Sequence, residues 1–103
     1  MFDHFSLAAP FYERVIGTAL DPTELCRRLA LPTPGRLLDA GGGTGRVAQT
    51  LRGKAGQIIV SDPSPGMLQQ AALKDGLWPV RAHAEHLPFA DATFARIIVV
   101  DAF

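Results

Sequence analysis

Cysteine, clustered basic residues and long apolar segments are all scarce in this chain. The single cysteine, Cys26, excludes an internal disulfide framework and a cysteine-based metal centre, so no metal site is expected. The 10 basic and 10 acidic residues balance, and the basic ones are scattered, which argues against a nucleic-acid-binding face. No apolar segment is long enough to span a membrane, and the N-terminus lacks the pattern of a signal peptide. These absences favour a soluble, cytoplasmic protein with no nucleic-acid or membrane partner.

Glycine, by contrast, is concentrated in one segment. Residues 39–45, Asp-Ala-Gly-Gly-Gly-Thr-Gly, follow an apolar stretch at 36–38 and precede residues 46–51, whose apolar positions have helical spacing. A strand, a glycine-rich turn and a helix in this order are typical of a nucleotide-type binding corner. Glycine accepts backbone angles that other residues resist, and its missing side chain lets a ligand lie against the main chain.

The rest of the chain alternates between expected helices and strands. Asp21 followed by Pro22 and Glu24 is a strong helix start, and Ser64-Pro65 begins another helix. Strands are expected at 36–40, 57–61, 80–84 and 94–100, and an irregular N-terminal helix at 2–16. Because strands that alternate with helices favour right-handed crossovers, the predicted fold class is α/β, a Rossmann-like doubly wound parallel sheet.

The apolar segment 94–100 is expected to be a strand buried on both faces, beside the first strand. With no later strand to cover it, this fourth strand would present an exposed apolar edge, which favours association. We expect residues 1–103 to be the N-terminal half of a larger domain. The alternative is that a second chain pairs along this edge, which predicts self-association through the fourth strand.

The residues alone leave open whether the glycines bind a dinucleotide or another nucleotide-like cofactor. Asp62 ends the second expected strand, roughly 20 residues after the glycines, where a carboxylate accepts hydrogen bonds from ribose hydroxyls. The simpler interpretation of Asp62 is a turn or helix cap. Residues 43–48 match the G-x-G-x-x-A pattern of dinucleotide binding, whereas the frame Asp39-x-Gly41-x-Gly43-x-Gly45 includes the acid. A P-loop is excluded because Arg46 follows the glycines.

Four segments together resemble a known family. They are Phe2–Glu13, Leu37–Gly45, Val60–Leu68 and Ala84–Phe94. Their motifs resemble those of the class I S-adenosylmethionine-dependent methyltransferases, in the group of the ubiquinone/menaquinone-biosynthesis methyltransferases (methyltransferase type 11). The resemblance implies S-adenosylmethionine as cofactor, a small-molecule methyl acceptor and the first four strands of a seven-stranded sheet. It makes 1–103 one cofactor-binding domain, with N-terminal helices at 1–34 and a β/α core at 35–103.

The resemblance also implies a role for each residue of the cofactor site. The methionine part would be held by Asp39, Ala40, Gly41, Gly43 and Gly45 and covered by Tyr12; the ribose hydroxyls would bind Asp62; the adenine would lie near Pro63, Met67, Ala84 and Glu85; and Asp101 would lie near the methyl-transfer centre.

Some positions depart from the group's pattern, and the chemistry needs few residues. His83 stands where the group often has an acid, although an unprotonated imidazole nitrogen can still bond an adenine amine. Methyl transfer from a sulfonium depends on alignment and exclusion of water, so no catalytic residue is assigned. Besides a methyltransferase, an NAD(P)-dependent oxidoreductase and a non-catalytic cofactor-binding or assembly module of the same fold remain open.

Overall fold

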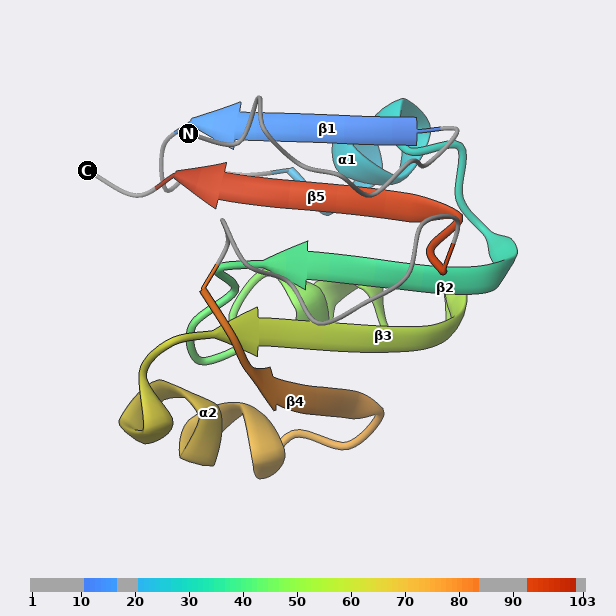
Figure 1. Ribbon diagram of the computed structural model, residues 1–103. Coiled ribbons are helices and arrows are strands. Elements are labelled where there is room, and N and C mark those ends of the chain that lie inside the picture. The colour runs from blue at the N-terminus through green and yellow to red at the C-terminus, as the bar shows by residue number, and fades with distance from the viewer. Residues whose placement is uncertain (1–10, 17–20, 84–92, 102–103) are drawn as a thin grey trace.

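Five parallel strands form one sheet in the computed structural model, which describes residues 11–16, 21–83 and 93–101. The strands are β1 (Phe11–Ile16), β2 (Thr33–Ala40), β3 (Ala55–Asp62), β4 (Leu77–Arg81) and β5 (Arg96–Asp101). Their order across the sheet is β1-β5-β2-β3-β4 (Figure 1). The pairing of β5 with β2 confirms that the segment 94–100 lies beside the first predicted strand.

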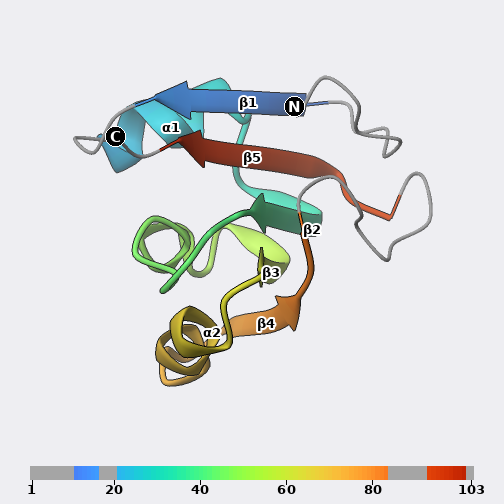
Figure 2. The same cartoon turned by 60° about the vertical axis from the view of Figure 1, so that its left-hand side comes forward.

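The helices in the described residues pack on one face of the sheet (Figure 2). They are the α-helices α1 (Pro22–Arg28) and α2 (Pro65–Ala72) and the 3-10 helix η2 (Ala48–Leu51). Both α-helices begin at the predicted caps: Asp21 accepts the Thr23 amide at 3.0 Å, and the Ser64 hydroxyl accepts the Met67 amide at 3.3 Å. The Rossmann-like, parallel α/β class is confirmed.

Alternation along the strands gives the sheet two apolar faces. On β2, Leu37 belongs to the core under the helices, and Leu38 belongs to the core on the opposite face. The core under the helices consists of Leu25, Leu29, Leu37, Val47, Ala48, Leu51, Ile58, Val60, Ala71, Leu77 and Ile98. The core on the other face consists of Leu38, Ala40, Ile59, Phe94, Ile97 and Val99. Burial on both faces fixes the carboxyl ends of β2 and β3, where the glycine-rich segment begins.

The N-terminal segment forms a strand where the sequence predicted an irregular helix. β1 runs parallel to β5, with Phe11 opposite Arg96 and Ile16 opposite Asp101. The aromatic and β-branched residues of 11–16 suit extended backbone, and the side of β5 away from β2 offers a full row of hydrogen-bonding groups. The prediction of N-terminal helices over 1–34 therefore holds only for α1, among the described residues. The predicted exposed edge of β5 is wrong, because β1 covers it.

The segment after the glycines is shorter than the predicted helix over 46–51. The described backbone contains η2, in which the Thr50 amide bonds to the Val47 carbonyl three residues earlier, at 3.0 Å. The Thr50 hydroxyl bonds to the same carbonyl at 2.7 Å, and Gly53 turns the chain with a φ of 80°. Competition by the hydroxyl and the early turn leave one tight turn of helix instead of two.

Candidate functional site

The glycine-rich segment crosses from the carboxyl end of β2 to that of β3. Ala40, the last residue of β2, is fully buried and lies opposite Ser61 of β3. The amides of Gly41 and Gly42 both donate to the Ser61 carbonyl, at 2.8 and 3.0 Å. These bonds hold the glycine loop, defined here as residues 41–45, over the end of β3. The loop therefore occupies the edge where ligands of open parallel sheets bind.

Three glycines of the loop have the left-handed backbone that favours glycine. Their φ angles are 72° at Gly41, 61° at Gly43 and 80° at Gly45. Gly45 is also closely packed, since a Cβ there would lie 2.6 Å from the Leu77 Cδ1 atom of β4. The frame Asp39-x-Gly41-x-Gly43-x-Gly45 thus contains the glycines whose backbone angles require that residue.

Gly42 is a part of this site that the sequence reasoning left out. A Cβ at Gly42 would lie 2.7 Å from both Cγ and Oδ2 of Asp39, and 2.8 Å from Val60 Cγ1. The backbone of the loop is therefore pressed directly against the Asp39 carboxyl group. The signal in the sequence was the unbroken run of three glycines, of which the alternating frame uses only the first and the third.

Asp39 lies buried beneath the loop. The residue is 1% exposed, and both carboxyl oxygens lack a partner among the described residues. Burial, helped by the nearby Asp62 charge and opposed by Arg46, raises the pKa of Asp39 to about 7. A buried acceptor with nothing to accept is costly, so a ligand that brings an N–H donor or a positive charge would relieve it.

Asp62 has the opposite surroundings, because both of its carboxylate oxygens accept backbone amides. Oδ2 accepts the Gly43 amide and Oδ1 accepts the Ser64 amide, each at 2.9 Å. The side chain thus ties the glycine loop to the start of α2. Each carboxylate oxygen can accept a second bond, and Asp62 is only partly buried, so it retains the capacity to bind hydroxyl groups.

Apolar surface adjoins Asp62 at the start of α2. Pro63 is exposed and Met67 is 47% exposed, although both are apolar residues. These two side chains offer the kind of surface against which a flat ring can lie.

Ser61, between Val60 and Asp62, is fully buried, and its hydroxyl oxygen has no partner among the described residues. Like Gly42, Ser61 is a residue of this site that the sequence did not predict.

The remaining predicted residues are not all brought to this corner. Tyr12 lies near the amino end of β1, and β5 separates it from β2, so the structure places it away from the loop. Asp101 ends β5 at the same edge of the sheet as the loop. His83, just beyond β4, is exposed. Ala84 and Glu85 lie outside the described residues.

Comparison with known proteins identifies the family of the chain that carries this site. The model of the family described as "Methyltransferase domain" matches residues 38–103, which contain the whole glycine loop, Asp62 and β5. The chain belongs to this methyltransferase family. A similar curated protein is the ubiquinone/menaquinone biosynthesis C-methyltransferase UbiE of Haemophilus ducreyi, 34% identical over 74 residues. That alignment covers 62% of this chain and 29% of the relative, so the chain spans less than a third of the relative's length.

A solved structure supports the fold of this methyltransferase-family chain. The YcgJ protein of Bacillus subtilis superposes with a TM-score of 0.69 at 23% identity, over 76% of this chain and 36% of that one. Family membership implies S-adenosylmethionine as the cofactor. The residues fit this group: an unpartnered buried carboxyl at Asp39 suits its ammonium, and the glycine loop leaves room for close approach.

Two further classes of site are not found in the described part of the chain. No group of three or more histidine, cysteine, aspartate or glutamate side chains is arranged to hold a metal ion within residues 11–16, 21–83 and 93–101. None of the helices described is long and apolar enough to cross a membrane.

Proposed function

We propose that this protein binds S-adenosylmethionine over the carboxyl ends of β2 and β3 and takes part in methyl transfer to a small-molecule acceptor. The observation that carries the proposal is the Asp39 carboxyl group, which is buried under the glycine loop and has no hydrogen-bond partner in the described part of the chain. A dinucleotide pyrophosphate is anionic and would be repelled there, whereas the methionine ammonium would be attracted. This charge argument favours a methyltransferase over the oxidoreductase alternative.

Different residues at the carboxyl ends of β2 and β3 are assigned to different parts of the cofactor. We assign the methionine part to Asp39, Ala40 and the glycines at 41, 43 and 45, and the ribose hydroxyls to Asp62. Pro63 and Met67 supply apolar surface for the adenine, and Asp101 lies at the same edge of the sheet. Tyr12 is given no part, because its position near the amino end of β1 lies away from the loop, and Ala84 and Glu85 remain predictions from the resemblance.

When bound, S-adenosylmethionine supplies a methyl group on a positively charged sulfur. The described residues would hold and orient it: the paired strand ends position Asp39 and Asp62, and the glycine loop, tied to Asp62 through the Gly43 amide, presents its backbone to the ligand. Alignment and exclusion of water are the main contributions required of a protein in such a displacement. We assign no general base. The UbiE relative is named a C-methyltransferase, which supports carbon as the accepting atom in this chain's acceptor.

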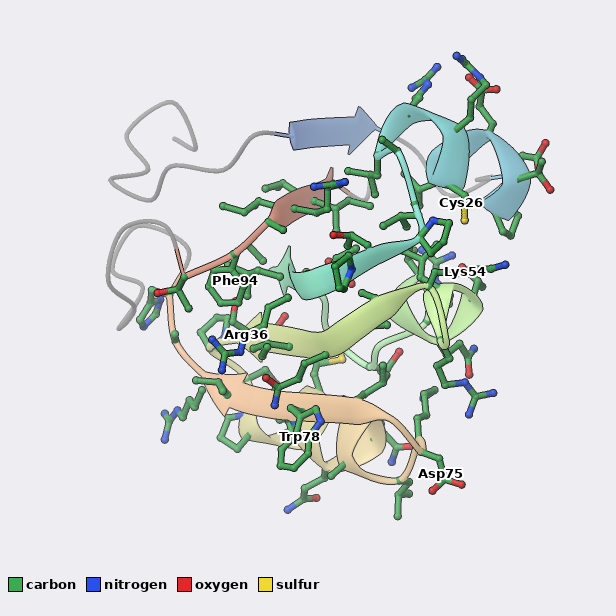
Figure 3. The ribbon with its side chains drawn as sticks, turned by 90° about the vertical axis from the view of Figure 1, so that its right-hand side faces the viewer. Cys26, Arg36, Lys54, Asp75, Trp78 and Phe94 are labelled. Atoms are coloured by element: carbon green, nitrogen blue, oxygen red, sulfur yellow. The ribbon has the colours of Figure 1, made fainter. Side chains whose placement is uncertain are left out.

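Calorimetry with three ligands tests the proposal. We expect S-adenosylmethionine and S-adenosylhomocysteine to bind and NAD not to bind. Asp62→Ala should weaken S-adenosylmethionine binding by at least tenfold, because loss of a charged hydrogen-bond partner costs about 1.5–3 kcal/mol. The matched control is Asp75→Ala, an exposed aspartate just before β4, at the opposite edge of the sheet (Figure 3). Tighter binding of NAD, or equal affinity in both variants, would contradict the proposal.

Two further expectations concern the cellular location of the protein and its self-association. We place the protein in the cytoplasm, which its single cysteine supports. Self-association, if it involves the sheet, would use an outer strand, β1 or β4, because β5 is paired on both sides. Light scattering measures the oligomeric state.

A further inference from the structure

One side chain reaches from the end of α2 to the glycine loop. The Lys74 ammonium donates to the Thr44 carbonyl at 2.9 Å and lies 3.5 Å from the Gln70 carbonyl. Lys74 and Thr44 are 30 residues apart in the sequence, so this is a tertiary contact and not a local turn. Thr44 sits between Gly43 and Gly45, both of which have left-handed backbone.

The stem of Lys74 supports the same stretch of backbone. A Cβ at Gly45 would lie 3.7 Å from the Lys74 Cδ atom and 3.6 Å from the Ala71 Cβ atom, so Gly45 packs on the end of α2. Lys74 is only partly exposed. Its methylene groups therefore lie against one residue of the loop while its ammonium holds the carbonyl of the preceding residue.

The first three amides of the loop are held from the other side, by β3, and the Gly45 amide bonds within the loop to the Gly42 carbonyl at 3.0 Å. The amides of Gly41 and Gly42 bond to the Ser61 carbonyl, and the Gly43 amide bonds to Asp62. These bonds fix the first half of the loop to β3. The hydrogen bond from Lys74 fixes the second half to the segment just beyond α2, so the loop is held at both ends.

A loop rich in glycine loses more conformational entropy on ordering than other segments do. If that cost fell at the moment of binding, it would be subtracted from the affinity, whereas a loop already held in place avoids it. We propose that Lys74 is a positioning residue, which keeps the glycine loop in its ligand-binding conformation before the cofactor arrives. This inference rests on the function proposed above.

The chain contains two lysines, which provides a matched control. Lys54 is exposed and precedes β3, at the edge of the sheet opposite the loop (Figure 3). We expect Lys74→Met to weaken S-adenosylhomocysteine binding about tenfold, with the loss in the binding entropy, because ordering about one more loop residue on binding costs about 1–2 kcal/mol. Lys54→Met should bind like the unaltered protein. Lys74→Arg, which can still donate to a carbonyl, should recover most of the affinity.

A second measurement uses the protein without ligand. Amide hydrogen exchange at Gly43–Gly45 should be faster in Lys74→Met than in Lys54→Met, and close to normal in Lys74→Arg. If the unaltered protein binds no adenosyl ligand, the proposed function fails, and the exchange data still decide whether Lys74 orders the loop. Unchanged exchange, or unchanged affinity in Lys74→Met, would overturn the inference. Should that variant not fold, Lys74→Gln, whose shorter side chain falls short of Thr44, takes its place in both comparisons.

Discussion

The carboxyl ends of β2 and β3 lie side by side, yet their two aspartates are in opposite states. Asp39 at the end of β2 is buried and accepts no hydrogen bond from the residues that the structure describes, whereas Asp62 at the end of β3 accepts two backbone amides. The Asp62 carboxyl group holds the loop in its conformation, whereas the Asp39 carboxyl group makes no such contact and lies beneath the loop. The contrast indicates that the end of β3 maintains the shape of the site and the end of β2 provides unmet bonding capacity for a ligand.

The largest expected effect concerns Asp39 in the ligand-free protein. Its folded pKa of about 7 lies above the reference value of 3.8, so its contribution to stability is complete below about pH 4 and is lost as the pH rises to about 7. At about 1.4 kcal/mol per pKa unit, the whole loss is slightly more than about 4 kcal/mol, of which about 3 kcal/mol falls between pH 5 and pH 8. Asp39→Asn should abolish most of this dependence and be the more stable protein at pH 8.

Urea unfolding at pH 5 and at pH 8 measures the Asp39 effect. The comparison of interest is the change in the free energy of unfolding between the two pH values, in the unaltered protein and in Asp39→Asn. Asp75→Asn, at an exposed position, should leave the pH dependence unchanged. An Asp39→Asn protein that follows the original pH curve would show that this carboxyl group is not buried as described.

An intermediate effect is expected where the loop presses against Asp39. Gly42→Ala would place a Cβ 2.7 Å from the Asp39 carboxyl and 2.8 Å from Val60, and overpacking of this kind costs about 1–3 kcal/mol. Gly66→Ala is the control, because its nearest neighbour would be the Ser64 hydroxyl oxygen at 3.9 Å and its backbone is helical. Thermal unfolding of both variants measures the difference. A Gly42→Ala protein as stable as Gly66→Ala would contradict the close packing.

The smallest effect is expected for Ser64→Ala, which distinguishes the role of Asp62 in the site from the role of the α2 cap in stability. Ser64 caps α2 through the Met67 amide, so Ser64→Ala should lower stability by about 1 kcal/mol. Affinity for S-adenosylmethionine should change little, because Asp62 keeps its bonds to the Gly43 and Ser64 amides. Calorimetry and urea unfolding on the same variant test both statements. A loss of affinity as large as that of Asp62→Ala would show that the cap and the site are one unit.

Local signals in the sequence were enough to predict most of the elements around the site. Asp21 and Ser64 cap α1 and α2 where expected, and the apolar stretches before Ala40 and Asp62 form β2 and β3. The strand β1 was missed because its pairing partner, β5, lies near the other end of the chain. No pattern within a short window distinguishes such a strand from an irregular helix.

The candidate site was predictable in position but not in state. The glycines at 41, 43 and 45 and the two acids followed from their spacing, and the structure brings these parts together. That Asp39 is unpartnered while Asp62 is bonded depends on which side of the loop each carboxyl group meets, which the sequence does not encode locally. The role of Gly42 and the contact from Lys74 to Thr44 likewise arise only when β3 and α2 pack against the loop.

The most direct test of the account is the number of protons released when S-adenosylmethionine binds. Calorimetry at pH 6, below the Asp39 pKa of about 7, in buffers of different ionisation enthalpy, gives this number. If the ammonium of the ligand meets Asp39, the carboxyl group must ionise, so we expect a net proton release that disappears in Asp39→Asn. Binding with the same heat in every buffer, or the same release in Asp39→Asn, would contradict the claim that this buried carboxyl group awaits a cationic ligand.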